Sequence, residues 1–193
     1  MADVQEAADR LVRAEAPLIV AGVEALHAGL QDRIARLAEL LWAPVVSDCG
    51  GKGMIYEAHA LGFGWTTSRR HVNGLFHECD AALAVGSRLR YVDFKRKGIR
   101  FPGLIHIDWD ERWIDRNFAA DLRVVGPVDR ILDALVDCLE SRCGRPAGEG
   151  ESDDGGFYDR DAPLRRTDPA ESRKPAIHGA AEAGSGPSGA AAA

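Results

Sequence analysis

The hydrophobic positions of this chain follow two alternating patterns. Short, nearly continuous apolar runs rich in Val, Ile, Leu and Ala are separated by longer stretches with helical spacing. Runs of this length and composition are typical of strands buried on both faces of a parallel sheet. They predict strands at 17–22, from Val45 onward, at 81–85, at 104–107 and at 122–125.

The stretches between these runs predict helices. Apolar residues between His27 and Trp42 recur at helical spacing, and a further helix is expected over residues 70–77. At the N-terminus, Asp3 followed by Glu6 has the spacing of a capping box and predicts a helix start. Near the end of the pattern, Pro127 suits a first helical position and precedes a regular apolar stripe.

Strands that alternate with helices predict a doubly wound, Rossmann-like α/β fold with a parallel sheet. The 193 residues, 46% of them hydrophobic, suffice for one domain with a core, and we assign this domain to residues 1–142. Residues 143–193 are dominated by Gly, Pro, Ala and charged residues. Such a composition offers too little apolar surface to offset the entropy of ordering, so we expect a disordered tail that is dispensable for folding.

Charge and cysteine usage exclude several classes of function. A net charge of -6 argues against a nucleic-acid or anionic-membrane surface, and no apolar run has the length of a membrane span. The four cysteines form no C-x-x-C pair, which favours a reduced, cytoplasmic protein. His71, His77 and Cys79 are close in sequence, but no further ligand pair accompanies them, so we predict no metal site.

The loops after the strands carry the candidate binding chemistry. Ligands of open α/β sheets bind where strands end, because loops and backbone N-H groups converge there. The glycine cluster 50–53 follows one strand and contains Lys52, although Met54 stands where a P-loop would have a hydroxyl. The candidate cofactor-binding residues are Gly22, Lys52, Gly86, Ser87, Arg88 and Asp108.

Three of these residues have alternative roles. Lys52 is suited to contact a phosphate or to lie at a subunit interface. Arg88 is suited to bind a pyrophosphate bidentately or to form a salt bridge across the end of the sheet. Asp108 is suited to accept a hydrogen bond from a ribose or adenine group, or to act as a helix N-cap or loop residue. No G-x-S-x-G elbow surrounds any serine, and no nucleophile has a base in reach, so we predict no catalytic residue.

Five sequence segments occur together in a characteristic order. They are PLIVAG at 17–22, APVV followed by GKG within 43–53, E-x-H-A-L-G at 57–62, DAALAVGSRL at 80–89 and HIDWDERWIDRN at 106–117. Over roughly residues 3–141 the chain resembles the central domain of thiamine-diphosphate enzymes of the acetolactate synthase type. The resemblance implies thiamine diphosphate and Mg²⁺ as cofactors of the complete enzyme.

The same resemblance places the catalytic groups elsewhere. In the family, the glutamate that activates thiamine lies on the preceding domain, and the G-D-G motif that binds magnesium and diphosphate lies on the following one. No G-D-G occurs here. We therefore expect a fragment or split component that is not catalytic alone and whose partners are the missing domains or further copies of itself.

Flavin-bearing members of the family hold FAD at these strand ends, and three departures argue against FAD here. Consecutive glycines are expected after the first strand, but Gly22 is followed by Val23 and Glu24, whose carboxylate would repel a phosphate. The acidic pair and arginine expected after Arg88 are absent from residues 89–92, and Pro127 replaces an aspartate.

These departures leave two alternatives to a thiamine-enzyme component. One is a non-enzymatic module that binds an ADP-containing nucleotide, or a partner, through the former cofactor face. The other is an unproductive truncation with a tail from outside the family. In the first, Asp108 and Arg88 would anchor the nucleotide.

Overall fold

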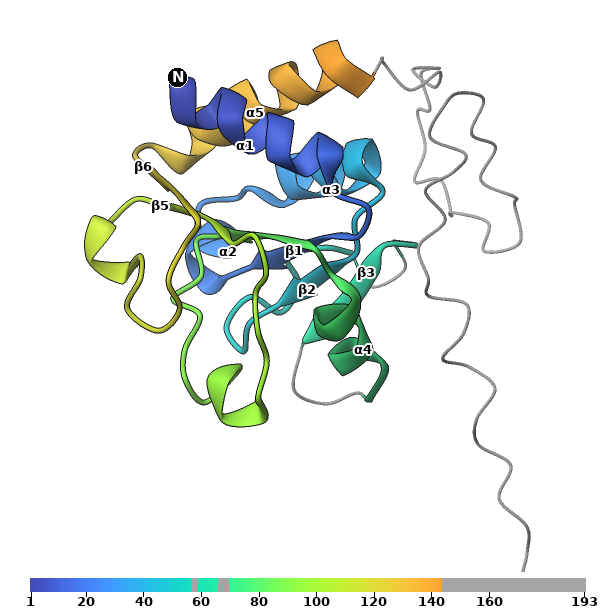
Figure 1. Ribbon diagram of the computed structural model, residues 1–193, viewed down its shortest axis with the longest axis vertical. Helices are drawn as coiled ribbons and strands as arrows, with labels where there is room; N and C mark the ends of the chain where they lie inside the picture. The colour runs from blue at the N-terminus through green and yellow to red at the C-terminus, as the bar shows by residue number, and fades with distance from the viewer. Residues whose placement is uncertain (57–58, 66–69, 144–193) are drawn as a thin grey trace, which may run out of the picture.

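The computed structural model describes residues 1–56, 59–65 and 70–143, which form a parallel six-stranded sheet between helical layers (Figure 1). Its strand order is β3-β2-β1-β4-β5-β6. The strands are β1 (Pro17–Ala21), β2 (Val45–Ser47), β3 (Gly62–Trp65), β4 (Ala81–Val85), β5 (Ile105–Asp108) and β6 (Leu122–Val125). This architecture confirms the predicted doubly wound α/β class.

The strand order contains one topological switch point. From the central β1, the chain adds β2 and β3 on one side, then crosses back to place β4 on the other side of β1. Ile19 accordingly pairs with Val45 on β2 and with Leu83 on β4. The loops after β1 and β4 therefore leave the sheet side by side, where ligands of such folds bind.

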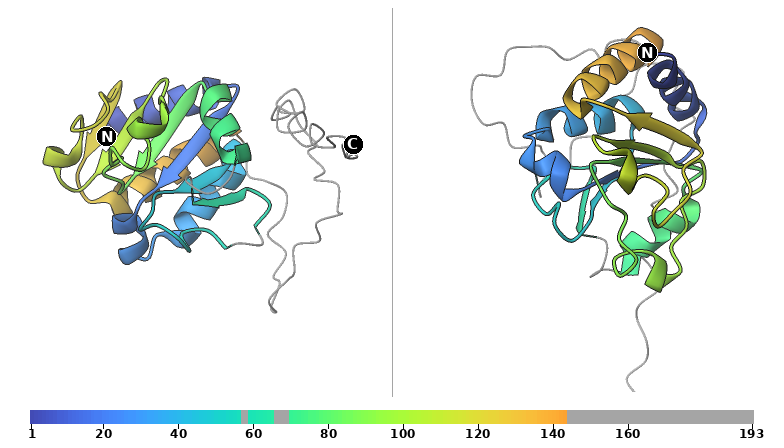
Figure 2. Two further views of the ribbon diagram at one scale, coloured as in Figure 1. Left: turned by 90° about the horizontal axis from the view of Figure 1, so that it is seen from below. Right: turned by 90° about the vertical axis from the view of Figure 1, so that its left-hand side faces the viewer.

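The helices divide unequally between the two faces of the sheet. One face is covered by α1 (Ala2–Arg13), α3 (Gln31–Leu41) and α5 (Val128–Cys143), and the other by α4 (Arg70–Glu78) (Figures 1 and 2). Three short elements occupy loops: α2 (Val23–His27), η1 (Lys95–Lys97) and η2 (Glu111–Trp113). Among the described helices, none is long and apolar enough to cross a membrane.

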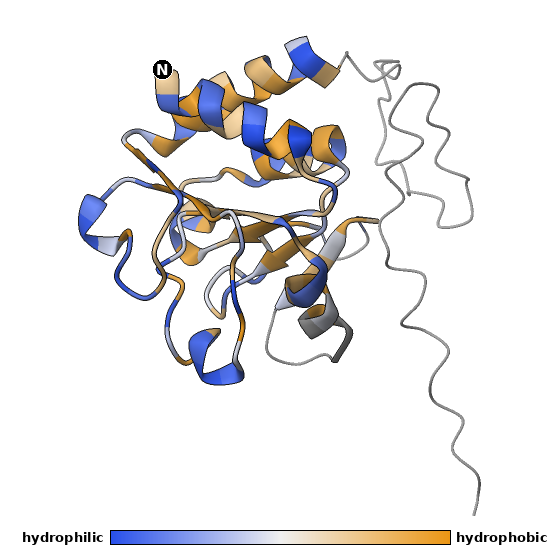
Figure 3. Cartoon of the chain, viewed as in Figure 1, coloured by the Kyte–Doolittle hydropathy of each residue, from blue (hydrophilic) through white to orange (hydrophobic). Residues whose placement is uncertain are grey.

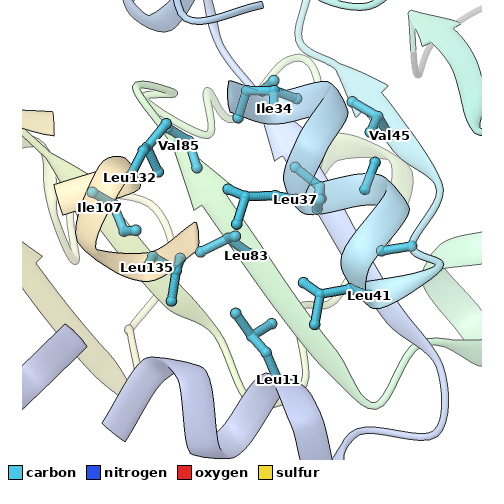
Figure 4. Close-up of a cluster of buried hydrophobic side chains, with 14 of the residues drawn as sticks. Leu11, Ile34, Leu37, Leu41, Val45, Leu83, Val85, Ile107, Leu132 and Leu135 are labelled. Atoms are coloured by element: carbon cyan, nitrogen blue, oxygen red, sulfur yellow. The ribbon is translucent and has the colours of Figure 1, made fainter. Parts of the chain in front are cut away.

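Successive strand residues supply two separate cores, because side chains alternate between the faces of a sheet. Ile19 and Leu83 face the three-helix layer, where leucines and isoleucines of α1, α3 and α5 converge on them (Figure 4). Leu18 and Val20 face the opposite side and pack with residues of α4. The hydropathy colouring shows apolar strands at the centre of the domain and many polar residues in the helices and loops around them (Figure 3).

Aromatic side chains fill much of the second core. Phe76, Phe94, Phe101 and Phe118 make edge-to-face contacts with ring centroids 4.8–6.0 Å apart. Such pairs stabilise a core beyond the area that they bury. They fix the long loop after β4 against the sheet. Cys79, at the end of α4, is also buried here, and desolvation raises the pKa of its thiol to about 11.

The structure differs from the prediction at three places. The helix predicted over 27–42 is α3, which begins only at Gln31 because Gly29 adopts a left-handed conformation (φ 67°), and the short α2 before it was not predicted. The predicted capping box is wrong: Met1 is the N-cap without a side-chain cap bond, and Glu6 pairs with Arg10 instead. Strand β3 was not predicted, since its sequence Gly-Phe-Gly-Trp contains two glycines.

The remaining strands lie within one residue of their predicted bounds, and helices α4 and α5 lie close to theirs. The predicted tail begins at residue 143, but Cys143 is the last residue of α5. The rest of the predicted tail, residues 144–193, lies outside the described residues, as does the first part of the E-x-H-A-L-G segment.

Candidate functional site: the carboxyl edge of the sheet

The loops after β1 and β4 contact each other directly at the switch point. The backbone N-H of Gly22 donates to the carbonyl of Val85 at 2.9 Å, and that of Glu24 donates to the carbonyl of Gly86 at 3.2 Å. A Cβ atom on Gly22 would lie 2.1 Å from the Gly86 carbonyl oxygen. Both glycines therefore permit close packing of one loop on the other.

The glycine cluster after β2 is held against the sheet by Asp48. Its Oδ1 atom accepts hydrogen bonds from the backbone N-H groups of Gly50 (3.0 Å) and Gly51 (2.9 Å). A Cβ atom on Gly51 would lie 2.6 Å from the carbonyl oxygen of Ala21. Lys52 is exposed on this loop. The glycines again serve contacts within the domain, and Lys52 alone among them presents a charge to solvent.

Ser87 belongs to a buried network that joins β2, β4 and β5. Its hydroxyl donates to Oδ2 of Asp48 at 2.8 Å, and its carbonyl accepts from Nε2 of His106 at 2.9 Å. Desolvation raises the pKa of Asp48 and lowers that of His106, which favours the neutral form of each. Because Ser87 is fully buried and its hydroxyl is engaged by Asp48, its side chain has an internal role in this structure.

Arg88 forms the salt bridge that was one of its two predicted roles. Its Nε and Nη2 atoms both donate to Oε1 of Glu24, at 2.9 and 2.6 Å. The guanidinium also lies over the ring of Trp113, 3.9 Å from the centroid. The amide of Asn117 donates to the carbonyl of Arg88 at 3.0 Å. Arg88 is therefore restrained by an anion and by an aromatic face.

Asp108 ends β5 completely buried, and only one of its carboxylate oxygens has a partner. Oδ1 accepts from the backbone N-H of Asp110 at 2.9 Å, which is the loop role predicted for it, while Oδ2 has no hydrogen-bond partner. Desolvation, with smaller contributions from Glu24 and Asp110, raises the pKa of Asp108 to about 6, and Arg88 opposes the shift. Asp108 is thus electrostatically coupled to the Glu24–Arg88 pair.

The described residues do not fit the catalytic cofactors of a thiamine enzyme. Within 1–56, 59–65 and 70–143, no group of three or more His, Cys, Asp or Glu side chains is arranged to hold a metal ion. The carboxylates at the edge are engaged with backbone N-H groups, Ser87 and Arg88. We therefore assign no step of thiamine chemistry to these residues.

Sequence reasoning missed two side chains that organise the edge. Asp48 followed by glycines two and three positions later has the pattern of an Asx turn, a signal that would have identified it. Trp113 is the second, and its contact with Arg88 spans 25 positions (88 to 113) without a local signal. Glu24 was recognised as an obstacle to phosphate, but its pairing with Arg88 was not predicted.

The fold and its edge define a Rossmann-like domain with charged side chains at its strand ends. Comparison with known proteins places it more closely. Residues 4–135 match the family model described as thiamine pyrophosphate enzyme, central domain, and the chain belongs to this family. The resemblance deduced from the sequence is thereby confirmed.

Several curated proteins are similar to this chain. The probable acetolactate synthase large subunit of Methanocaldococcus jannaschii is 32% identical over 142 residues, which cover 70% of this chain and 24% of that protein. The probable 2-ketoarginine decarboxylase of Pseudomonas aeruginosa is 32% identical over 147 residues, 75% of this chain and 26% of that protein. Glyoxylate carboligase of Escherichia coli O157:H7 is 29% identical over 142 residues, 71% of this chain and 24% of that protein. The chain spans about a quarter of these relatives.

Proposed function

We propose that this chain serves as the central, non-catalytic domain of a thiamine-diphosphate-dependent carboligase or decarboxylase. The observation that carries the proposal is the family match over residues 4–135, on a fold whose described edge offers no metal cluster. The similar proteins include carboligases and a decarboxylase by name, so the proposal specifies the reaction class and leaves the substrate open.

In this proposal, thiamine diphosphate and Mg²⁺ are held by other domains. When bound, thiamine diphosphate would supply an electron sink that stabilises negative charge on the former carbonyl carbon of the substrate. The central domain contributes a rigid platform against which the catalytic domains pack, either in a longer chain or in an assembly of chains. We further propose that the domain associates with the absent domains or with further copies of itself, and that turnover requires the absent domains.

The test is reconstitution. With pyruvate, thiamine diphosphate and Mg²⁺, the purified chain should produce neither acetolactate nor acetaldehyde above a heat-denatured control. Co-expression with the two flanking domains of a relative that has lost its own central domain should restore cofactor-dependent turnover. Turnover by the chain alone that disappears when thiamine diphosphate is removed would contradict the proposal.

A second candidate function is binding of an ADP-containing nucleotide at the carboxyl edge. The observation that favours it is Oδ2 of Asp108, a buried acceptor without a partner at the carboxyl end of β5, on the edge of the sheet where ligands of such folds bind. Asp108 and Arg88 would be the anchors, with Gly22, Gly86 and Ser87 in the flanking loops and Lys52 toward solvent. The replacements at Glu24, Val92 and Pro127 support a site without FAD.

Calorimetric titration with ADP and FAD tests this candidate. ADP should bind, and Asp108→Ala should weaken it by about 1–3 kcal/mol because hydrogen-bonding groups of the ligand lose their partner. A yellow preparation or tight FAD binding would contradict the absence of flavin. Unchanged ADP affinity in Asp108→Ala would remove Asp108 from the site.

A further inference from the structure

Arg88 is a cation at the carboxyl end of β4, one of the two strands that border the switch point. In an open sheet with this strand order, ligands bind beside the switch point between β1 and β4. Arg88 directly follows the Gly86-Ser87 turn at the end of β4. A guanidinium with two N-H groups on one edge is suited to a phosphate or a carboxylate.

The anion that Arg88 binds in this structure belongs to the protein itself. Two nitrogens of Arg88 converge on Oε1 of Glu24, and the backbone N-H of Glu24 bonds to Gly86. Trp113 holds the guanidinium from one face. Glu24 is the less exposed partner, with 24% of its side-chain surface accessible against 43% for Arg88. Glu24 is therefore fixed by backbone and side chain on the β1 side of the switch point.

We propose that Glu24 is a built-in competitor that fills the phosphate position at Arg88. The domain supplies its own anion at the switch point, and the diphosphate of a nucleotide can bind Arg88 only when Glu24 is displaced or neutralised. This deepens the nucleotide candidate described above, because it names the group that regulates access to that site.

Asp108 supplies an independent observation for a ligand at the same place. Its unpartnered, fully buried Oδ2 shows that the polar groups of this edge are not all satisfied within the domain. Its coupling to both Glu24 and Arg88 places it in the same electrostatic environment. Glu24 thus pairs with Arg88 within the domain, whereas Oδ2 of Asp108 has no hydrogen-bond partner.

The experiment uses inorganic pyrophosphate, which has no adenosine and requires nothing of Asp108. We expect Glu24→Gln to bind pyrophosphate at least about tenfold more tightly than the unchanged chain, since the like charge is gone and Arg88 is released. Adding Arg88→Met to Glu24→Gln should abolish the gain. The matched control is Asp133→Asn, which releases Arg33 from a similarly bidentate pair on the helical layer and should gain nothing.

A second comparison does not depend on the folding of Glu24→Gln. Arg88→Met alone should bind pyrophosphate as weakly as the unchanged chain, because Glu24 already occupies Arg88 in that chain. A clear loss of affinity in Arg88→Met, or no gain in a folded Glu24→Gln, overturns the proposal.

ADP separates this proposal from the nucleotide candidate. A gain for pyrophosphate without a gain for ADP would sink the nucleotide candidate and support the competitor role of Glu24. Conversely, ADP binding that depends on Asp108 but is insensitive to Glu24→Gln would support the nucleotide candidate and refute the competitor.

Discussion

The interior of the sheet and its carboxyl edge are stabilised by different interactions. The interior between α1, α3 and α5 consists of aliphatic side chains with no exposure, such as Leu37 and Leu83. The buried polar and charged side chains of the described residues lie on or after β2, β4 and β5: Ser47, Asp48, Ser87, Asp93, His106 and Asp108. Dispersion and the hydrophobic effect thus stabilise the interior, and specific hydrogen bonds stabilise the carboxyl edge.

The two regions differ in the amino-acid substitutions that they tolerate. An aliphatic interior tolerates exchange of one apolar side chain for another of similar volume. A hydrogen-bonded edge does not, because removal of one partner leaves the other buried without a bond. A single substitution at the edge is therefore expected to cost more stability than a volume-conserving apolar exchange in the interior.

The largest effect is expected from a cavity in the interior. Leu83→Ala on β4 should lower the free energy of unfolding by about 2–5 kcal/mol, because the apolar contacts are lost and the rigid neighbours refill the space only in part. Urea denaturation followed by circular dichroism measures it. Val125→Ala, at a position that is 47% exposed, is the control and should change stability by less than about 0.5 kcal/mol. Similar losses in both variants would contradict a distinct interior.

The next effect concerns the buried network at the edge. Asp48→Ala should cost about 1–3 kcal/mol, because the N-H groups of Gly50 and Gly51 and the hydroxyl of Ser87 lose their acceptor. Asp48→Asn keeps an acceptor oxygen for the two N-H groups and should cost less. Equal losses in both variants, measured by urea denaturation, would show that the charge of Asp48 matters more than its hydrogen bonds.

The third prediction uses the pKa of Asp108. Because its pKa is about 6 in the folded state against an ordinary value of 3.8, the folded chain holds this proton more tightly than the unfolded chain. Stability from this group is full below about pH 4 and is lost as pH rises through 6. Between about pH 4.5 and pH 7.5, a range that spans the pKa of Asp108, the stability of Asp108→Asn should rise by about 1–2 kcal/mol relative to that of the unchanged chain.

Thermal melts across this pH range measure the difference. The stability difference between Asp108→Asn and the unchanged chain should grow in favour of the variant as pH rises. Asp110→Asn is a control on the partly exposed neighbour, and its stability difference should stay nearly constant over this range, because pairing with Arg112 lowers the pKa of Asp110 to about 2. A difference for Asp108→Asn that is constant with pH would show that its carboxyl does not titrate in this window.

The smallest effect is expected for the Glu24–Arg88 pair. A double-mutant cycle with Glu24→Gln and Arg88→Met should give a coupling below about 1 kcal/mol, because both side chains are partly solvated. The coupling should fall further at about 1 M salt, where charges are screened within a few ångströms. A salt-independent coupling well above this value would mean that the pair holds the switch point together as strongly as the buried network does.

The fold was predictable because buried strands require runs of apolar residues, which are easily recognised in the sequence. The runs at Ala81–Val85 and Leu122–Val125 predicted their strands within one residue. Short elements were missed where the signal is weak: α2 has only five residues, and β3 relies on Phe63 and Trp65 between glycines. Apolar runs predicted their strands even in β6, where Val124 alone is buried, whereas short or glycine-rich elements contain too few apolar positions to form a pattern.

The candidate site was predictable in position but not in connectivity. The rule that ligands bind at strand ends led to Arg88 and Asp108, because it depends only on strand order. The sequence does not reveal the partners of Arg88, because Glu24 and Trp113 lie 64 and 25 positions away along the chain. They contact Arg88 only once the strands have assembled into the sheet. A pairing between two loops is a property of the assembled sheet.

The burial of Cys79 has a consequence for observing motion in this domain. Its thiol donates to the carbonyl of Phe76 and has a pKa of about 11, so the reactive thiolate is scarce at neutral pH. A thiol reagent can reach Cys79 only after the end of α4 has opened, whereas Cys49 and Cys143 are exposed. The rate at which Cys79 is alkylated therefore measures how often the core around Phe76 opens, and no label has to be added to the protein.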